Sequence, residues 1–284
     1  MRWTGDRSDI EDMRGRSGFG GGMMPIGLGG FVVLLLLSWV SGTNLFSLLG
    51  SGTQSPTAVG TSGQVNSSPA EEKLADFVGA VSKDVQDMWA ERLGPQYERT
   101  HVVLFRDAIQ SACGSAESAT GPFYCPADRK VYLDLGFFDE LSRRFGAPGD
   151  FAQAYVIAHE IGHHVQTLLG LNARASQDRR SGAQSASVGL ELQADCFAGV
   201  WGHAASENGR FQAGHVELDP GDADEAIRAA GAIGDDRLQR MATGRVMPDR
   251  FTHGSSAQRI ESFSRGMQSG DPRACTGSPA TTTR

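Results

Sequence analysis

The chain has 284 residues, of which 39% are hydrophobic and 21% are charged, and its formal net charge is −7. This composition is typical of a globular protein with one or two domains, and the negative charge argues against nucleic acid as a partner. The four cysteines form no C-x-x-C pair, which excludes zinc-ribbon and thioredoxin-like sites and fits two disulfides in an oxidising compartment.

The N-terminal region predicts a membrane anchor. Residues 1–22 are charged and then glycine-rich, whereas residues 23–40 carry no charge. With the apolar side chains that follow up to residue 49, this stretch is long enough to cross a bilayer. Arginines precede it and no Lys or Arg follows until Lys73, so we expect residues 1–22 in the cytoplasm and a single span over 23–49. The long, partly acidic leader favours an uncleaved anchor over a cleaved signal peptide.

A flexible linker is expected over residues 50–70, because this stretch has no charge and almost no large apolar side chain. The folded domain should then span 71–275, outside the cytoplasm, and residues 276–284 should form a disordered tail. The domain begins with a helix over 71–93, where apolar residues recur at spacings of three and four. A short strand is predicted over 101–105.

Residues 111–135 predict a small antiparallel sheet. Two short strands, 122–125 and 130–135, flank a turn rich in Pro and Asp. An earlier strand, with small residues over 112–115, could hold a peptide substrate along its edge, or could equally be a buried inner strand. A helix over 137–145 follows.

The four cysteines can be paired from this sheet. Cys113 and Cys125 would lie on neighbouring strands, so we pair them with each other. That choice leaves Cys196 with Cys275, although four cysteines allow three pairings in principle.

The most specific signal lies in a helix predicted over 151–169, after the capping residue Asp150. It contains His159-Glu160-x-x-His163, the pattern of a zinc-hydrolase helix. Residues four apart lie on one helix face, so both neutral imidazoles can reach one Zn²⁺ ion. Glu160 can take a proton from a zinc-bound water as general base. Because this short pattern also arises by chance, the rest of the chain must supply a third ligand.

A later helix, predicted over 190–201, can supply that ligand. Gln166 and Leu169 stand where another zinc-protease class has Gly and His, which excludes that class. Glu191 can complete a His-His-Glu site with one open position for water. Asp195, four residues on, can accept a hydrogen bond from a ligand histidine and fix its tautomer. The neighbouring residues are largely apolar, so both carboxylates should be buried and need a cation or a donor.

The C-terminal third contains an acidic cluster and one histidine of interest. Five acidic residues lie before and within the first turn of a helix predicted over 222–230: Glu217, Asp219, Asp222, Asp224 and Glu225. They should offset the helix dipole, and their spacing matches no known calcium-binding loop. Helices over 235–242 and 257–267 follow. His253, in the loop between them, is a candidate donor to the oxyanion of a tetrahedral intermediate, or is bonded only to loop backbone.

Several of these stretches resemble the bacterial neutral zinc metallopeptidase family. They are Cys113-Gly114 and residues 121–126, 158–166, 191–196 and 251–254. The resemblance extends over nearly the whole chain. It implies a membrane-anchored α+β protein whose zincin-like domain is mostly helical.

The sequence therefore predicts a membrane-anchored zinc peptidase that acts on peptide or protein substrates. Zn²⁺ would be held by His159, His163 and Glu191, with Glu160 as general base. The protein is expected in the cell membrane, with its catalytic domain outside the cytoplasm. The alternative is a membrane-tethered binding or scaffold protein whose zinc site is structural or inactive.

Overall fold

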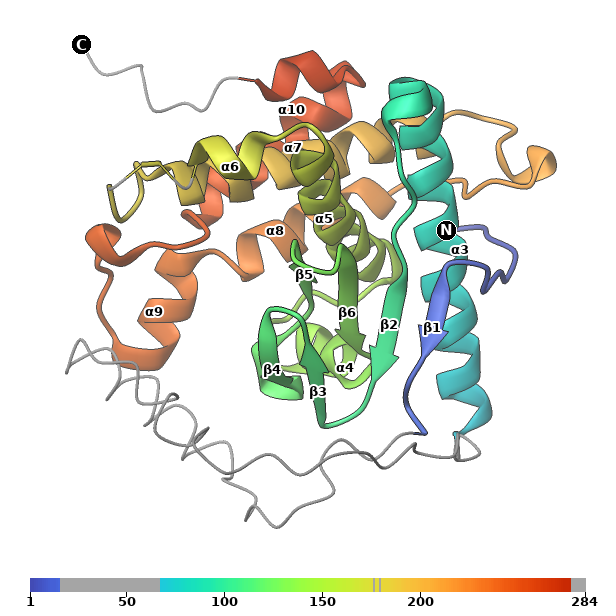
Figure 1. Cartoon of the computed structure of the whole chain (residues 1–284), viewed down its shortest axis with the longest axis horizontal. Coiled ribbons are helices and arrows are strands. Elements are labelled where there is room, and N and C mark those ends of the chain that lie inside the picture. The colour runs from blue at the N-terminus through green and yellow to red at the C-terminus, as the bar shows by residue number, and fades with distance from the viewer. Residues whose placement is uncertain (16–66, 176, 179, 277–284) are drawn as a thin grey trace.

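A computed structural model describes residues 1–15, 67–175, 177–178 and 180–276. Helices predominate and the strands are few and short, so the α+β class is confirmed (Figure 1). Among the described residues, no helix combines the length and the apolar character that a membrane crossing requires. The predicted span over 23–49 lies outside the described residues, as do nearly all of the linker and the tail.

The main sheet is mixed rather than antiparallel. Its four strands lie in the order β1-β2-β6-β5, and their bounds are Ile10–Asp12, Val102–Phe105, Lys130–Asp134 and Phe123–Cys125. β1, β2 and β6 are parallel, and only β5 runs antiparallel, beside β6. The antiparallel hairpin predicted from 122–125 and 130–135 is confirmed by β5 and β6, whereas β1 and β2, which lie outside 111–135, add to the sheet as parallel strands. Residue alternation locates a strand, but partners distant in the sequence decide its direction.

A separate hairpin accounts for the strand predicted over 112–115. Among the described strands, β3 (Ala108–Ser111) pairs only with β4 (Gly114–Glu117), in a sheet of two strands. Cys113 lies in the turn between them, and most residues of β4 are exposed. The segment is therefore neither a buried inner strand nor an edge of the main sheet.

Helix α5 (Asp150–Leu168) runs through the centre of the molecule and is mostly buried. It packs against α3, α7 and α8 and, at one end, against the sheet (Figure 1). These neighbours are α3 (Pro69–Leu93), α7 (Ala186–Ala205) and α8 (Asp222–Ala232). α7 begins four residues before its predicted start, because the Ser185 side chain accepts a hydrogen bond from Val188 N and caps it.

Helices α7 and α10 (Ser256–Ser269) cross with their backbones in contact. A methyl group on Gly199 would lie 2.1 Å from the carbonyl oxygen of Phe263, and one on Gly266 would lie 1.9 Å from that of Cys196. Glycine is therefore required at both positions for the helices to approach this closely.

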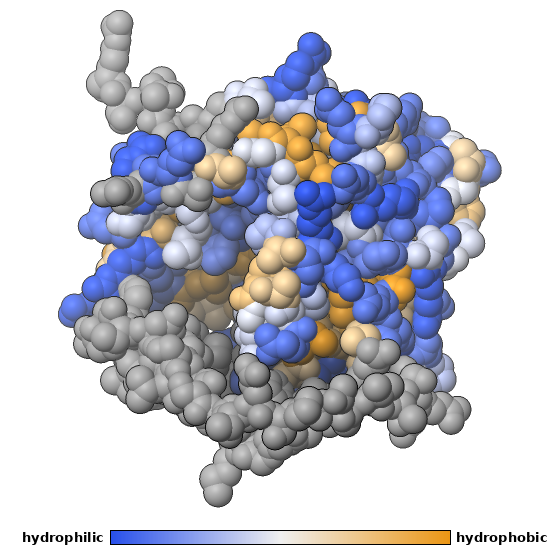
Figure 2. All heavy atoms as spheres, in the orientation of Figure 1, coloured by the Kyte–Doolittle hydropathy of each residue, from blue (hydrophilic) through white to orange (hydrophobic). Residues whose placement is uncertain are grey.

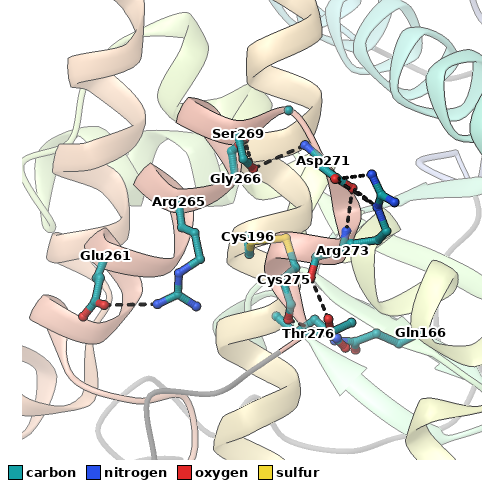
Figure 3. The surroundings of a disulfide bond; sticks show 12 residues. Gln166, Cys196, Glu261, Arg265, Gly266, Ser269, Asp271, Arg273, Cys275 and Thr276 are labelled. Atoms are coloured by element: carbon teal, nitrogen blue, oxygen red, sulfur yellow. Dashed lines mark hydrogen bonds and ion pairs between the residues drawn. A yellow bond between two sulfur atoms is a disulfide. The ribbon is translucent and has the colours of Figure 1, made fainter. Parts of the chain in front are cut away.

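Both predicted cysteine pairs lie at bonding distance in the structure. Cys113–Cys125 joins the turn of the β3–β4 hairpin to β5. Cys196–Cys275 joins α7 to the short helix Pro272–Cys275, which follows α10 (Figure 3). The second bond therefore strengthens the crossing of α7 and α10.

Three shorter helices complete the described fold: α4 (Gly136–Arg143), α6 (Leu171–Ala175) and α9 (Asp235–Thr243). α6 lies in a stretch for which no helix was predicted. In α9 only Asp235 is buried, so this helix packs loosely on the rest of the domain.

Residues 1–15 belong to the folded domain, which differs from the prediction that it begins at residue 71. β1 adds to the edge of the sheet beside β2 and α3 (Figure 1). Periodicity missed β1 because it has only three residues.

Candidate metal centre

Three predicted ligands meet where α5 and α7 cross. The ligand atoms of His159, His163 and Glu191 all lie within 4.8 Å of one another, so the group could hold a metal ion. Glu191 Oε2 is 3.2 Å from His159 Nε2, and its Oε1 is 3.5 Å from His163 Nε2. A methyl group on Gly162 would lie 3.2 Å from Ala194 Cα, so the glycine allows α7 to come close.

The other nitrogen of each histidine ring has its own acceptor. His159 Nδ1 is 2.8 Å from Asp195 Oδ1, and His163 Nδ1 is 2.9 Å from Gln166 Oε1. Because a carboxylate and an amide oxygen only accept, both Nδ1 atoms carry the proton in the neutral rings. Both Nε2 lone pairs then face the oxygens of Glu191. Acceptors that face one another need a cation between them, and this donor set suits Zn²⁺.

The charges around the ligands favour a positive charge at the same place. Burial would lower the pKa of His159, but Asp195 and Glu191 outweigh it and raise that pKa to about 10. The pKa of His163 is raised in the same way, by the charge of Glu191 against burial. Burial would raise the pKa of Glu191, but the two histidines hold it well below its usual range. Without a metal, a proton would therefore take the place of the cation.

Asp195 is the centre of a buried network that holds His159. Tyr155 Oη donates to Asp195 Oδ1 over 2.5 Å. Arg259, on α10, binds both carboxylate oxygens through Nε and Nη2, at 2.9 and 2.8 Å. Burial would raise the pKa of Asp195, but the charges of Arg259 and His159 lower it to about 2. Asp195 therefore remains a carboxylate and fixes the tautomer of His159.

The roles of Tyr155 and Arg259 were not predicted from the sequence. For Arg259, helical spacing was a usable signal. It lies four residues before Phe263 and seven before Gly266, so all three share the buried face of α10. An arginine on a buried helix face requires a carboxylate partner. Tyr155 lies four residues before His159, so helical spacing also put it on the metal face.

Gln166 is a third residue whose role was not predicted. Its Nε2 donates to the carbonyl oxygen of Leu190 and to Oε1 of Gln193, at 2.7 and 3.1 Å. These two acceptors fix the orientation of the amide and turn its oxygen toward His163 Nδ1. Gln166 therefore orients one ligand and ties α5 to α7.

Replacing Gln166 by Leu should weaken zinc binding about 10–100-fold, because residues that orient a metal ligand have effects of this size. The measurement is competition between the protein and a chromophoric zinc chelator. Gln110→Leu, at the exposed position of strand β3, is the matched control and should bind zinc like the unaltered chain. Equal zinc affinity in Gln166→Leu and Gln110→Leu would contradict this role.

The site opens into a cavity of about 830 Å³. All three ligands line it, together with Glu160 and His253. Figure 2 shows a hollow between α9 and the β4–β5 side of the molecule, with hydrophobic residues in its depth. Glu160 is 8% exposed, and within the described part of the chain its carboxylate makes no hydrogen bond or ion pair. It is therefore free to act on a molecule in the cavity.

His253 lines the cavity, but its side chain is 51% exposed. Its Nδ1 is 2.8 Å from Thr252 Oγ1. Asp235 holds the loop in place, since its Oδ2 accepts from the backbone N–H groups of Thr252, His253 and Gly254 at 2.6–2.9 Å. The backbone of this loop is fixed, while the imidazole is directed to the cavity wall and to solvent.

Comparison with known proteins agrees with this donor set. Residues 1–277 match the model of a family described as "Putative neutral zinc metallopeptidase". The chain belongs to this family. In Escherichia coli K12, the uncharacterized protein YpfJ is 44% identical over 289 residues, which cover 97% of this chain and 98% of the relative.

A second relative of the chain is the uncharacterized protein Rv2575 of Mycobacterium tuberculosis H37Rv. It is 46% identical over 202 residues, which cover 70% of this chain and 68% of the relative. No solved structure matches the chain significantly. The family resemblance seen in the sequence is thus confirmed. A zinc peptidase family implies a metal, and the His-His-Glu group could bind it.

Proposed function

We propose that the chain is a zinc-dependent peptidase in which His159, His163 and Glu191 hold Zn²⁺ and Glu160 is the general base. One observation carries the proposal. The three donors converge at an open cavity beside a carboxylate that is free to act there. A purely structural zinc site would use four protein ligands and would be closed to solvent.

The residues divide the reaction between them. Zinc bound by this donor set would acidify a water molecule and polarise the carbonyl of a peptide bond. Glu160 takes the proton of the attacking water and passes it to the nitrogen of the departing amine. Asp195 and Gln166 keep the two imidazoles in the tautomer that binds metal. His253, on the cavity wall, is the candidate donor to the oxyanion.

Strand β5 is the edge that would receive the substrate, in place of the segment 112–115. It is the last strand of the main sheet, and Pro122, Phe123 and Tyr124 line the cavity. An extended peptide can add to such an edge through backbone hydrogen bonds. His164 joins α5 to β5, since its Nδ1 is 3.1 Å from Tyr124 Oη, and its Nε2, 2.6 Å from the carbonyl oxygen of Glu98, joins α5 to the segment before β2.

The cavity walls suggest which substrates would fit. Apolar side chains from several elements line it, among them Phe137, Phe145, Val156 and Leu238. These residues would favour peptides with a large apolar side chain next to the cleaved bond. The two disulfides support a site of action outside the cytoplasm.

The test uses the full-length protein and an unfolded substrate such as casein. With one zinc bound per chain the protein should cleave casein, a chelator should stop the cleavage, and added zinc should restore it. The measurements are zinc content by mass spectrometry and peptide release with time. One zinc per chain without cleavage of any unfolded substrate would instead favour a binding or scaffold protein with an inactive site.

A further inference from the structure

The N-terminal amino group lies in a cluster of carboxylates. The nitrogen of Met1 is 3.1 Å from Asp150, 3.3 Å from Asp219 and 3.1 Å from Asp222. Asp150 is the first residue of α5, and its side chain does not cap that helix, contrary to the prediction. Glu225 does so instead, since its Oε2 accepts from Phe151 N over 3.0 Å. The carboxylate of Asp150 is thus left to bind the ammonium.

The next residues extend this contact. The backbones of Arg2 and Glu217 exchange two hydrogen bonds, of 2.9 and 3.1 Å. The guanidinium of Arg2 also binds the side chains of Glu217 and Asp219. Three members of the acidic cluster, Glu217, Asp219 and Asp222, therefore bind the chain's own N-terminus.

Helix α3 is shaped to receive the segment. A methyl group on Gly79 would lie 1.7 Å from the carbonyl oxygen of Asp6, so only glycine lets this backbone pass. The ring of Trp3 packs edge-on against Phe77, with centroids 5.4 Å apart. Arg7 Nε donates to Asp76 over 2.6 Å.

The end of the segment is held by buried polar contacts as well as by the sheet. Asp9 is buried, and its Oδ2 accepts from Gln86 Nε2 over 2.8 Å. Arg14 is buried too, between Asp12 and Glu72, at 2.6 and 2.9 Å. A segment in loose contact with the surface would not bury two charged side chains, each bonded to polar partners.

We propose that Asp150, Asp219 and Asp222 form a binding site for the free α-ammonium of Met1, and that residues 1–15 dock on the domain through it. The ligand of this site is the chain's own N-terminus. Docking requires an amino group without formyl, acyl or added residues, because these would remove the charge and fill its space. It also requires residues 1–15 and the domain to share one side of any membrane.

The same carboxylates could be mistaken for a metal site. Asp150, Asp222 and Glu225 have ligand atoms within 4.8 Å of one another. However, the ammonium already supplies the positive charge, and Glu225 caps α5. Partial burial would lower the pKa of the ammonium, but its bonds to Asp150 and Asp222 raise it to about 10. The amine therefore stays charged at physiological pH.

The first experiment measures how fast the α-amine reacts with an amine-specific ester at pH 8, in the full-length protein. With a pKa of about 10 rather than 8.0, about fifty times less of the amine is uncharged. Labelling of Met1 should therefore be about 50-fold slower than in a free peptide of residues 1–8. Asp150→Asn should raise the rate several-fold, whereas Asp224→Asn, exposed on α8, should not change it. Labelling at the rate of the free peptide would overturn the proposal.

The second experiment tests where the segment lies in cells. The Cβ of a residue replacing Gly5 would be 3.2 Å from that of Asp76, close to the distance in a disulfide, about 3.5–4.5 Å. Cells that make full-length Gly5→Cys/Asp76→Cys are treated with a membrane-permeant oxidant. Mass mapping of non-reduced tryptic peptides should then find residues 3–7 linked to residues 74–83.

The pair Gly5→Cys/Glu261→Cys is the control, because Glu261 lies on α10 and is exposed. The bond Cys196–Cys275 in the same sample reports correct folding. If the protein folds correctly but the Gly5→Cys/Asp76→Cys pair gives no more disulfide-linked peptide than the control pair, the docking is overturned. That result would favour a single membrane crossing between the two segments.

Discussion

Replacing Glu160 by Gln should lower turnover about 10²–10⁴-fold while the full complement of zinc stays bound. The amide has the shape of the carboxylate but cannot take a proton from water. The Glu160 carboxylate makes no hydrogen bond or ion pair with another described residue, and the three proposed ligands are unaltered. The fold and the zinc content should therefore not change. The measurements are initial rates on casein and zinc per chain.

The turnover of Glu160→Gln is compared with that of two other variants. Glu140→Gln, at the cavity rim on α4, makes the same chemical change and should keep turnover within about twofold. His253→Ala should lower kcat with zinc still bound if its imidazole assists the oxyanion. A Glu160→Gln protein as active as Glu140→Gln would disprove the role of Glu160.

Replacing Arg259 by Met should cost about 3–5 kcal/mol of unfolding free energy in the metal-free protein. Asp195 is fully buried and receives two hydrogen bonds from Arg259. Without the guanidinium, no arginine balances the negative charge of Asp195, and α7 and α10 lose the contact between these two side chains. Zinc should recover part of the loss, because its charge reaches Asp195 through His159. The measurement is denaturant unfolding with and without a chelator.

The matched control is Arg143→Met on α4, whose ion pair with Asp139 is exposed and 3.9 Å long. Its effect should be below about 0.5 kcal/mol. The loss of unfolding free energy in Arg259→Lys should lie between those of the two Met variants, since an ammonium keeps the charge but cannot bind both oxygens of Asp195. An Arg259→Met protein as stable as Arg143→Met would show that Asp195 does not depend on this partner.

Much of the site could be predicted from the sequence because its residues obey helical spacing. His159 and His163 lie one turn apart, as do Glu191 and Asp195, and both helices were recognised from their apolar residues. The cysteine pairs followed from the predicted hairpin region. Each of these inferences uses residues that are near in the sequence, where geometry is nearly fixed.

Contacts between distant segments could not be predicted in this way. Arg259 meets Asp195 across 64 positions in the sequence, and Met1 meets Asp150 across 149. The parallel pairing of β2 with β6 joins strands that are more than twenty residues apart, and no local pattern specifies it. The acidic residues before α8 looked like a favourable helix start, and only the fold shows that an ammonium lies among them.

The crossing of α7 and α10 makes one wall of the cavity more rigid than the wall that α9 forms. Gly199 and Gly266 bring these helices into backbone contact, and Cys196–Cys275 joins the middle of α7 to the short helix that follows α10. The wall with the metal ligands therefore resists deformation. Another wall includes α9, in which only Asp235 is buried. Any adaptation to the width of a substrate should thus come from α9, while the metal geometry stays constant from one substrate to the next.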